Sequence, residues 1–202
     1  MALRLSVVLP IFNEEGNLAR LIGEIVAAIP ELWHPYEILC VDDASTDGSV
    51  AELVALQETV AAVRILRHRL NCGQSAAVAS GFAEALAGVV ITLDSDGQND
   101  PADIPKYLAA LAPEVDCVCG IRARRIDSAV KRLSSKAANR FRRWLLKDSI
   151  TDAGCGFRAV RRETLAEVPV FNGMHRFLPI VMRAQGKRVT EIEINHRPRT
   201  VG

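Results

Sequence analysis

The stretch Val89–Pro101, VVITLDSDGQNDP, decides how this chain is interpreted. Its first part, Val89–Leu93, is β-branched and apolar, which is typical of a buried strand that ends at turn-forming residues. Asp94, Asp96 and Gln98 follow directly. Open α/β sheets bind ligands in the loops after their parallel strands, and hard cations prefer oxygen ligands, so these side chains are a candidate Mg²⁺ or Mn²⁺ site. Because such ions also bind phosphates, a nucleotide diphosphate is the expected ligand.

The same loop also has an ordinary structural interpretation. An Asp-x-Asp pattern such as Asp94 and Asp96 is a weak motif by itself, because aspartates are common in loops. Asp100 followed by Pro101 is also a typical helix start. The metal hypothesis therefore depends on what the rest of the chain places beside this loop.

Length and composition favour a single globular domain over residues 1–202. The chain has 202 residues, of which 49% are hydrophobic and 24% are charged, enough for one well-buried core. Its five cysteines fit neither a zinc spacing nor a disulfide framework and suit a reducing compartment. No apolar run is long enough to cross a bilayer, and the N-terminus lacks a signal-peptide pattern. We therefore expect any membrane contact made by these residues to be peripheral.

Charge is distributed unevenly along the chain. The whole sequence has a formal charge of +1, but residues 122–147 carry ten Lys or Arg and one acid, so this segment is +9 and the remainder is −8. This asymmetry favours one basic surface facing an anionic partner and argues against a nucleic-acid binder. Residues 128–147 are predicted to form a basic amphipathic helix. Its Lys- and Arg-rich face suits an anionic membrane surface, with an ordinary solvated helix face as the alternative.

Strands and helices alternate along the rest of the chain, which predicts an α/β fold with a mostly parallel sheet covered on both faces. The predicted strands are residues 5–12, 37–41, 63–66, 89–93, 115–121 and 188–195. The first predicted helix is capped by Asn13 and continues to Pro30, and the later ones cover residues 50–61, 75–87, 104–111 and 176–185. Gly154 and Gly156 predict a tight turn.

Polar side chains follow three of these strands, at the point where each strand ends. They are Asn13 and Glu14, Asp42 and Asp43, and Asp94 and Asp96. The carboxyl ends of parallel strands lie at one edge of a sheet, so these side chains are predicted to share one cleft. A purely structural role would leave them scattered.

Together, the motifs resemble those of a known family. VVLPIFNEEGNL, VDDASTDGS, NCGQSAAVASGF, LDSDGQNDP, DAGCGFRAVRRE, MHRFLP and NHRPRTVG resemble, in order and spacing, inverting family-two glycosyltransferases of the GT-A fold. The likeness is greatest to polyprenyl-phosphate glycosyltransferases of the dolichol-phosphate mannosyltransferase and undecaprenyl-phosphate sugar transferase type. It covers essentially the whole chain, and its most specific parts are the Asp-Ser-Asp-Gly-Gln run and the HRPR tail.

The resemblance implies roles for individual residues. The nucleotide sugar would be bound by Pro10, Phe12, Glu14, Asp42, Asp43, Asp94 and Arg199. A divalent metal, Mg²⁺ or Mn²⁺, would be held by Asp94, Asp96 and Gln98. The acceptor phosphate would be bound by Arg122, Arg132 and Ser135. The catalytic residues would be Asp96, Arg122 and Asp152, the last at a position sometimes proposed as a base.

The chain departs from the family pattern in two places. Phe12 stands where the family often has Tyr, which removes a hydroxyl but keeps a stacking face. The sequence ends at Gly202, where relatives continue with a Ser-Lys segment and often transmembrane helices. A further expectation is therefore that the chain is a piece of a longer membrane protein.

The implied activity is that of a glycosyltransferase of the hexosyltransferase type. An oxygen of a polyprenyl phosphate would displace the nucleoside diphosphate at the sugar's anomeric carbon. A phosphate monoester needs little help from a base, because its second pKa is about 6. An orienting role for Asp152 beside an arginine is therefore an equal alternative. The bacterial character of the resemblance favours a UDP-sugar over a GDP-sugar donor, at the cytoplasmic face of the inner membrane.

Three other functions are weighed against this one. Transfer to a hydroxyl, as in polysaccharide or glycolipid synthesis, would need a general base. Sugar nucleotidyltransferases share the sheet but normally carry a basic, Gly-rich loop after the first strand, where this chain has the acidic PIFNEEGN. A basic, non-enzymatic adaptor at a membrane surface leaves the acidic strand ends unexplained.

Overall fold

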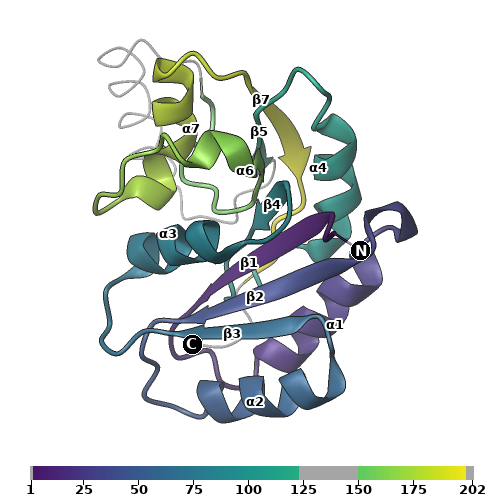
Figure 1. Cartoon of the computed structure of the whole chain (residues 1–202), viewed down its shortest axis with the longest axis vertical. Coiled ribbons are helices and arrows are strands. Elements are labelled where there is room, and N and C mark those ends of the chain that lie inside the picture. The colour runs from purple at the N-terminus through teal and green to yellow at the C-terminus, as the bar shows by residue number, and fades with distance from the viewer. Residues whose placement is uncertain (1, 123–149, 199–202) are drawn as a thin grey trace.

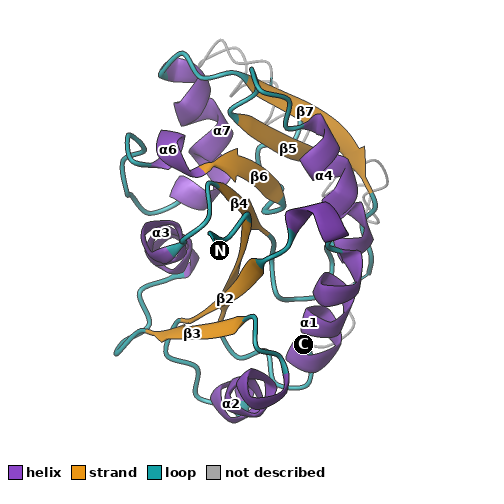
Figure 2. Cartoon of the chain, turned by 45° about the vertical axis from the view of Figure 1, so that its right-hand side comes forward, coloured by secondary structure: helices purple, strands orange, loops and turns teal. Residues whose placement is uncertain are grey.

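The structure, a computed structural model, describes residues 2–122 and 150–198. These residues form three layers, with one sheet between two layers of helices (Figures 1 and 2). The predicted basic helix at 128–147 lies outside the described residues. Within the described part, no helix has both the length and the apolar character needed to cross a bilayer.

The sheet has seven strands in the order β3-β2-β1-β4-β6-β5-β7. The strands are β1 (Leu5–Ile11), β2 (Tyr36–Asp42), β3 (Val63–Arg67), β4 (Val89–Thr92), β5 (Cys117–Arg122), β6 (Arg158–Arg161) and β7 (Val189–Ile194). Every pairing is parallel except those of β6 with β4 and β5. The predicted α/β class with a mostly parallel sheet is confirmed.

Strand β6 was not predicted. It lies antiparallel between β4 and β5, with Val160 opposite Val90 and Ala159 opposite Val118. The sequence indicated only a turn at this point, because four residues with an arginine at each end are too short to show a strand period. Its position in the sheet is fixed by neighbours far away in the sequence.

Helices cover the two faces of the sheet in separate groups. The helices α1 (Leu18–Ala28), α2 (Ser49–Thr59) and α4 (Ile104–Ala110) pack on one face, and α3 (Gln74–Glu84), α6 (Arg162–Leu165) and α7 (Met174–Ala184) pack on the other. Short 3₁₀ turns occupy Glu31–Trp33 and Pro101–Asp103. In β1, the side chains of Val7 and Leu9 pack in the core on the face covered by α1, α2 and α4, and Val8 packs in the core on the opposite face. The strand is therefore buried on both sides. This explains its nearly continuous apolar sequence.

Helix α3 lies close against β1. A Cβ added at Gly81 would be 2.3 Å from Val8 Cγ1, so only glycine fits this contact without a shift of the helix. The close contact fixes the direction of α3, whose first turn reaches the carboxyl end of the sheet.

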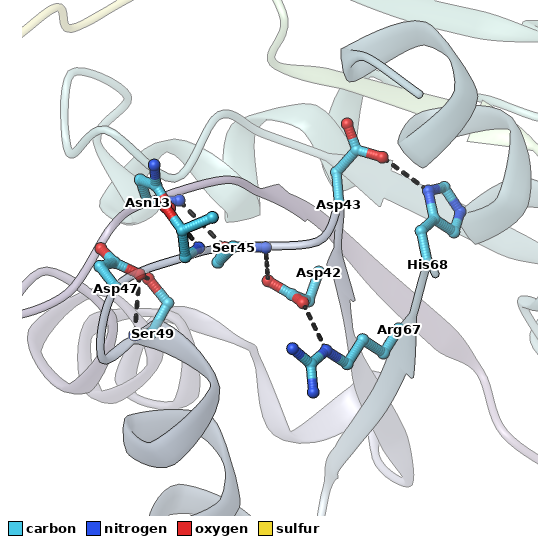
Figure 3. A network of polar contacts seen from close by, with 9 residues as sticks. Asn13, Asp42, Asp43, Ser45, Asp47, Ser49, Arg67 and His68 are labelled. Atoms are coloured by element: carbon cyan, nitrogen blue, oxygen red, sulfur yellow. Dashed lines mark hydrogen bonds and ion pairs between the residues drawn. The ribbon is translucent and has the colours of Figure 1, made fainter. Parts of the chain in front are cut away.

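The first helix starts later than predicted. Asn13 has a positive φ of 56° and does not cap a helix, and α1 begins at Leu18. The reason is that the Asn13 side chain bonds another loop, since its Oδ1 accepts from Thr46 N at 2.8 Å. Asn13 N also donates to Ser45 Oγ at 3.0 Å, as Figure 3 shows. These contacts join the loops after β1 and β2.

The opposite, amino end of the sheet holds a buried polar network around Glu37. The Glu37 side chain is 3% exposed and pairs with Arg64. Its Oε1 accepts from Ser6 Oγ at 2.5 Å and from Leu86 N at 2.7 Å. Ser6 Oγ in turn accepts from Ala87 N at 3.0 Å. This network joins β1 and β2 to the segment between α3 and β4.

We predict that Glu37→Ala lowers the free energy of unfolding by about 2–3 kcal/mol, because it leaves buried donors and part of the Arg64 charge unpaired. Urea denaturation measures the change. The matched control is Glu58→Ala, an exposed acid on α2, which should change stability by less than about 0.5 kcal/mol. Equal stabilities of the two variants would contradict the role given to this network.

Candidate functional site

One cavity opens at the carboxyl ends of β1, β2 and β4, beside the first turn of α3. Its volume is about 420 Å³. The predicted residues that line it are Pro10, Phe12, Glu14, Asp43, Asp94 and Asp96. Of the six polar residues that follow the strand ends, Glu14, Asp43, Asp94 and Asp96 line this cavity, whereas Asn13 and Asp42 do not.

Other predicted residues lie away from the cavity wall. Asp42, Gln98, Arg122 and Asp152 are described but do not line the cavity. Arg132, Ser135 and Arg199 lie outside the described residues.

Asp42 stabilises the turn that contains Asp43. Its side chain is fully buried, and its Oδ1 accepts from Ser45 N at 3.2 Å. Its Oδ2 lies 3.3 Å from Arg67 Nε (Figure 3). The carboxylate therefore faces the turn and the third strand, whereas Asp43 next to it faces the cavity.

Asp43 accepts several hydrogen bonds from the segment that follows β3. Its Oδ1 is 2.7 Å from His68 Nδ1 and accepts from Cys72 N at 2.9 Å. Its Oδ2 accepts from Gly73 N at 2.7 Å. A carboxylate has about four acceptor positions, so Asp43 holds this loop and can still bind a ligand.

A flat apolar surface lies beside these polar groups. Phe12 lines the cavity and is 46% exposed, which suits stacking of a planar ligand group. Ser95 Oγ donates to Pro10 O at 2.8 Å, which joins the end of β1 to the loop after β4. The two loops therefore keep a fixed separation.

The acidic loop after β4 is ordered by its own hydrogen bonds. Asp94 N donates to Asn99 Oδ1 at 2.9 Å, and Gln98 N donates to Asp96 Oδ1 at 3.1 Å. Gln74, at the start of α3, donates from Nε2 to Asp94 Oδ1 at 2.7 Å. Gln98 thus contributes its main chain to the loop.

Burial raises the pKa of Asp94, and the negative charge of Asp96 raises it further. The positive charges of Arg158 and Arg122 act in the opposite direction. Two carboxylates that repel each other in a half-buried loop are stabilised by a cation between them. Both offer oxygen, the ligand type that Mg²⁺ and Mn²⁺ prefer, so the residues present fit a hard divalent cation.

Two residues near Asp94 were missed by the sequence analysis. Gly156 packs against the carboxylate, since an added Cβ would be 2.5 Å from both Asp94 oxygens. Arg158 is 1% exposed; it donates from Nη1 to His175 O and from Nη2 to Ala153 O, the latter at 2.9 Å. The Gly-x-Arg pattern inside CGFR was the available signal, but only the fold shows which acid these residues approach.

Asp152 and Arg122 form a two-point ion pair. Arg122 Nε is 2.7 Å from Asp152 Oδ2, and Nη2 is 2.8 Å from Oδ1. Thr151 N donates to Glu191 Oε1 at 2.8 Å, which fixes the start of this loop. The structure therefore supports an orienting contact between these two predicted catalytic residues.

The last described residues cross the acidic loop. Arg197 N donates to Gln98 O at 2.9 Å, and its side chain pairs with Glu24 and Asp100, each at 2.6 Å. Asn195 N donates to Asp103 Oδ2 at 2.7 Å. Arg197, which precedes Arg199 by two residues in the HRPR tail, is thus bound to two carboxylates.

Comparison with known proteins identifies the family. The sequence model described as Glycosyl transferase family 2 matches residues 6–168. A protein of Pectobacterium carotovorum named undecaprenyl-phosphate 4-deoxy-4-formamido-L-arabinose transferase is 38% identical over 200 residues, which are 98% of this chain and 61% of that protein. A protein of the same name from Pseudomonas fluorescens is 36% identical over 98% of this chain and 58% of its own length. The chain thus spans less than two thirds of these relatives.

Solved structures share the fold. Glucosyl-3-phosphoglycerate synthase from Mycobacterium tuberculosis in complex with uridine diphosphate matches 98% of this chain and 73% of its own, with a TM-score of 0.76 and 20% identity. The same enzyme in complex with Mn²⁺, uridine diphosphate and phosphoglyceric acid gives a TM-score of 0.74 at 20% identity, over 98% of this chain and 72% of that one. Likeness at this identity concerns the fold alone, and the fold is GT-A. The chain belongs to glycosyl transferase family 2.

Proposed function

We propose that this chain transfers a sugar from a nucleotide-diphosphate donor, UDP-linked in preference to GDP-linked, to a polyprenyl phosphate. The observation that carries the proposal is the cavity that joins Asp43, Asp94 and Asp96 at one edge of the sheet. The names of the relatives include undecaprenyl phosphate, and solved structures of the same fold are described as complexes with uridine diphosphate and Mn²⁺.

The nucleoside would occupy the part of the cavity between β1 and β2. Phe12 offers a stacking face, Asp43 offers acceptor oxygens to a base or ribose, and Pro10 and Glu14 complete the wall. Asp42 lies behind this wall, so we propose that it acts by fixing the turn that carries Asp43.

Asp94 and Asp96, with Gln98, would hold Mg²⁺ or Mn²⁺. Such an ion, when bound, stabilises the negative charge that grows on the leaving diphosphate. Gly156 and Gln74 keep the Asp94 carboxylate turned toward the cavity, and Arg158 partly offsets its charge. We propose that Arg199 contacts the same diphosphate.

The acceptor would be an ionised phosphate bound by Arg122, with Arg132 and Ser135. The Asp152 carboxylate is engaged by Arg122 through both oxygens, which suits the positioning of Arg122 better than proton abstraction. A phosphate acceptor needs no strong base, whereas a hydroxyl acceptor does. The ion pair therefore favours a lipid phosphate over the alternative of a hydroxyl in polysaccharide or glycolipid synthesis.

A lipid acceptor places the reaction at a membrane surface. We propose that the chain works at the cytoplasmic face of the inner membrane, and that the basic segment at 122–147 contacts anionic lipid there. Membership of a glycosyltransferase family argues against the purely adaptor role and against the sugar nucleotidyltransferases.

Asp96→Asn tests the metal site. We expect it to remove the metal-dependent part of UDP affinity, because an amide lacks the charge that a hard cation needs. The loss should exceed the roughly tenfold that removal of an outer-shell contact costs. Calorimetric titration of UDP with and without Mn²⁺ measures this, with Glu58→Gln as the control. An unchanged metal-dependent affinity would show that Asp96 is not a ligand.

Gly156→Ala tests the placement of Asp94. The new methyl group would occupy the space of the Asp94 carboxylate, so UDP affinity in Mn²⁺ should fall about tenfold, while UDP affinity without metal changes little. Gly23→Ala is the matched control, because an added Cβ there meets nothing within 4 Å. If the two glycine variants bind UDP and Mn²⁺ alike, Gly156 does not position Asp94 for the metal.

Asp152→Asn and Asp152→Ala together separate an orienting role from a base role. The amide keeps an oxygen for Arg122, so Asn should retain most transfer to a short, soluble polyprenyl phosphate, and Ala should retain much less. A general base would instead make both variants fail alike, by roughly a hundredfold or more. Initial rates at saturating donor distinguish the two patterns.

A further inference from the structure

A second cluster of potential metal ligands includes Asp43, which lines the cavity. The Asp43 carboxylate, the His68 ring and the Cys72 thiol each offer a ligand atom, and these atoms all lie within 4.8 Å of one another. His68 Nδ1 is 2.7 Å from Asp43 Oδ1, and the two side chains point toward each other in Figure 3. The side chains of His68 and Asp43 are only 15% and 3% exposed, so the nitrogen and oxygen are held in place.

The pairing of β2 with β3 and the turn after β3 assemble this cluster. His68 N donates to Asp42 O at 2.9 Å, which continues the pairing of β2 with β3 past its last residue pair. The chain then turns so that Cys72 N and Gly73 N both donate to the Asp43 carboxylate. Gly73 has a φ of +86°, a conformation that favours glycine. The loop thereby returns the Cys72 side chain to the same carboxylate that His68 contacts.

The ligand types differ from those of the acidic loop. Asp94 and Asp96 offer only oxygen, which suits Mg²⁺ or Mn²⁺, but this cluster offers one oxygen, one nitrogen and one sulfur. Zinc binds this combination of carboxylate, imidazole and thiolate. Of the five cysteines, all of which lie in the described residues, Cys72 alone is exposed, so its thiol is the one that an entering cation can reach.

The surroundings of His68 favour a metal-bound imidazole. His68 Nε2 is 2.9 Å from Ser80 Oγ, a hydroxyl that can accept its proton. Without a cation, Nδ1 donates to Asp43, because a carboxylate 2.7 Å away only accepts. When a cation takes the place of that proton, the neutral ring carries its proton on Nε2 and donates it to Ser80 Oγ. Outer hydrogen bonds of this kind orient metal-binding histidines.

We propose that Asp43, His68 and Cys72 form a binding site for a thiophilic divalent cation, with Zn²⁺ as the cation that fits best. On binding, the Cys72 thiol loses its proton to solvent. The His68 ring loses the Nδ1 proton and takes one up at Nε2, so it stays neutral and one proton is released in total. Three protein ligands leave a fourth position for water. None of its three ligands belongs to the oxygen site formed by Asp94 and Asp96.

Zinc at this cluster would regulate donor binding, a consequence that rests on the proposed function. Asp43 faces the cavity where the nucleoside is proposed to bind. A carboxylate that coordinates zinc has fewer free acceptor positions and less net charge to offer a nucleoside. Zinc and the nucleotide donor should therefore weaken each other's binding.

The first experiment titrates Co²⁺, a spectroscopic substitute for zinc, into the full, reduced chain. We expect a near-ultraviolet thiolate-to-cobalt absorption band that saturates at a single equivalent and disappears when Zn²⁺ is added. Cys72→Ser should abolish the band, and His68→Gln should weaken cobalt binding by more than the roughly tenfold expected for the outer-shell variant Ser80→Ala. Circular dichroism checks that the variants are folded.

Asp96→Asn is the matched control, because it alters the oxygen site and should leave the thiolate band unchanged. Absence of the band in the parent chain, or its persistence in Cys72→Ser, would overturn the proposal. Neither result depends on nucleotide binding, so a failure here is separate from a failure of the proposed function.

The second experiment measures UDP affinity in Mg²⁺ with and without Zn²⁺. Zinc should raise the apparent Kd of UDP for the parent chain, and this effect should be lost in Cys72→Ser. If the cobalt band appears but zinc leaves the UDP affinity unchanged, the metal site is supported and the regulatory consequence is overturned. An equal effect of zinc on the parent and on Cys72→Ser would show that zinc acts elsewhere, and would also overturn that consequence.

Discussion

The half-buried negative charge that follows β4 is the constraint on which the rest of the structure depends. Asp94 loses hydration and lies beside Asp96, and both effects raise its pKa. The fold compensates with the positive charges of Arg158 and Arg122 and with a hydrogen bond from Gln74. Strand β6 brings Arg158 to this place, and the glycine at 156 gives the carboxylate room. A divalent cation would complete the compensation.

The two ends of the sheet have different roles: the amino end carries a stabilising polar network, and the carboxyl end carries the candidate binding site. At the amino end, Glu37 is almost fully buried and its oxygens bind Ser6, Arg64 and Leu86. At the carboxyl end, loops after β1, β2, β3 and β4 surround a cavity and hold one another through side-chain contacts. The rigid sheet between them allows these loops to carry exposed polar groups without loss of the fold. Open α/β sheets bind ligands at this end for the same reason.

Much of the fold follows from local sequence. The alternation of apolar strands with helical spacing predicts a mostly parallel sheet, since each element carries its own period along the chain. The polar ends of β1, β2 and β4 were predicted to meet because parallel strands share a direction, and one residue or more from each end, Glu14, Asp43, Asp94 and Asp96, does line one cavity. Such predictions need only the order of the elements and the rule that relates strand ends to one edge.

Tertiary structure alone decided the partners of single side chains. Asn13 bonds the loop after β2 in place of its own helix, Arg197 binds Glu24 and Asp100, and Asp152 is engaged by Arg122. Asp43, His68 and Cys72 meet only because β3 pairs beside β2 and its loop turns back at Gly73. These contacts join residues that are distant in the chain, where no period or spacing relates them. The sequence therefore determined most of the elements and the edge of the sheet at which their polar ends gather. The packing of those elements decided the position of β6 and which charges and ligand atoms face each other.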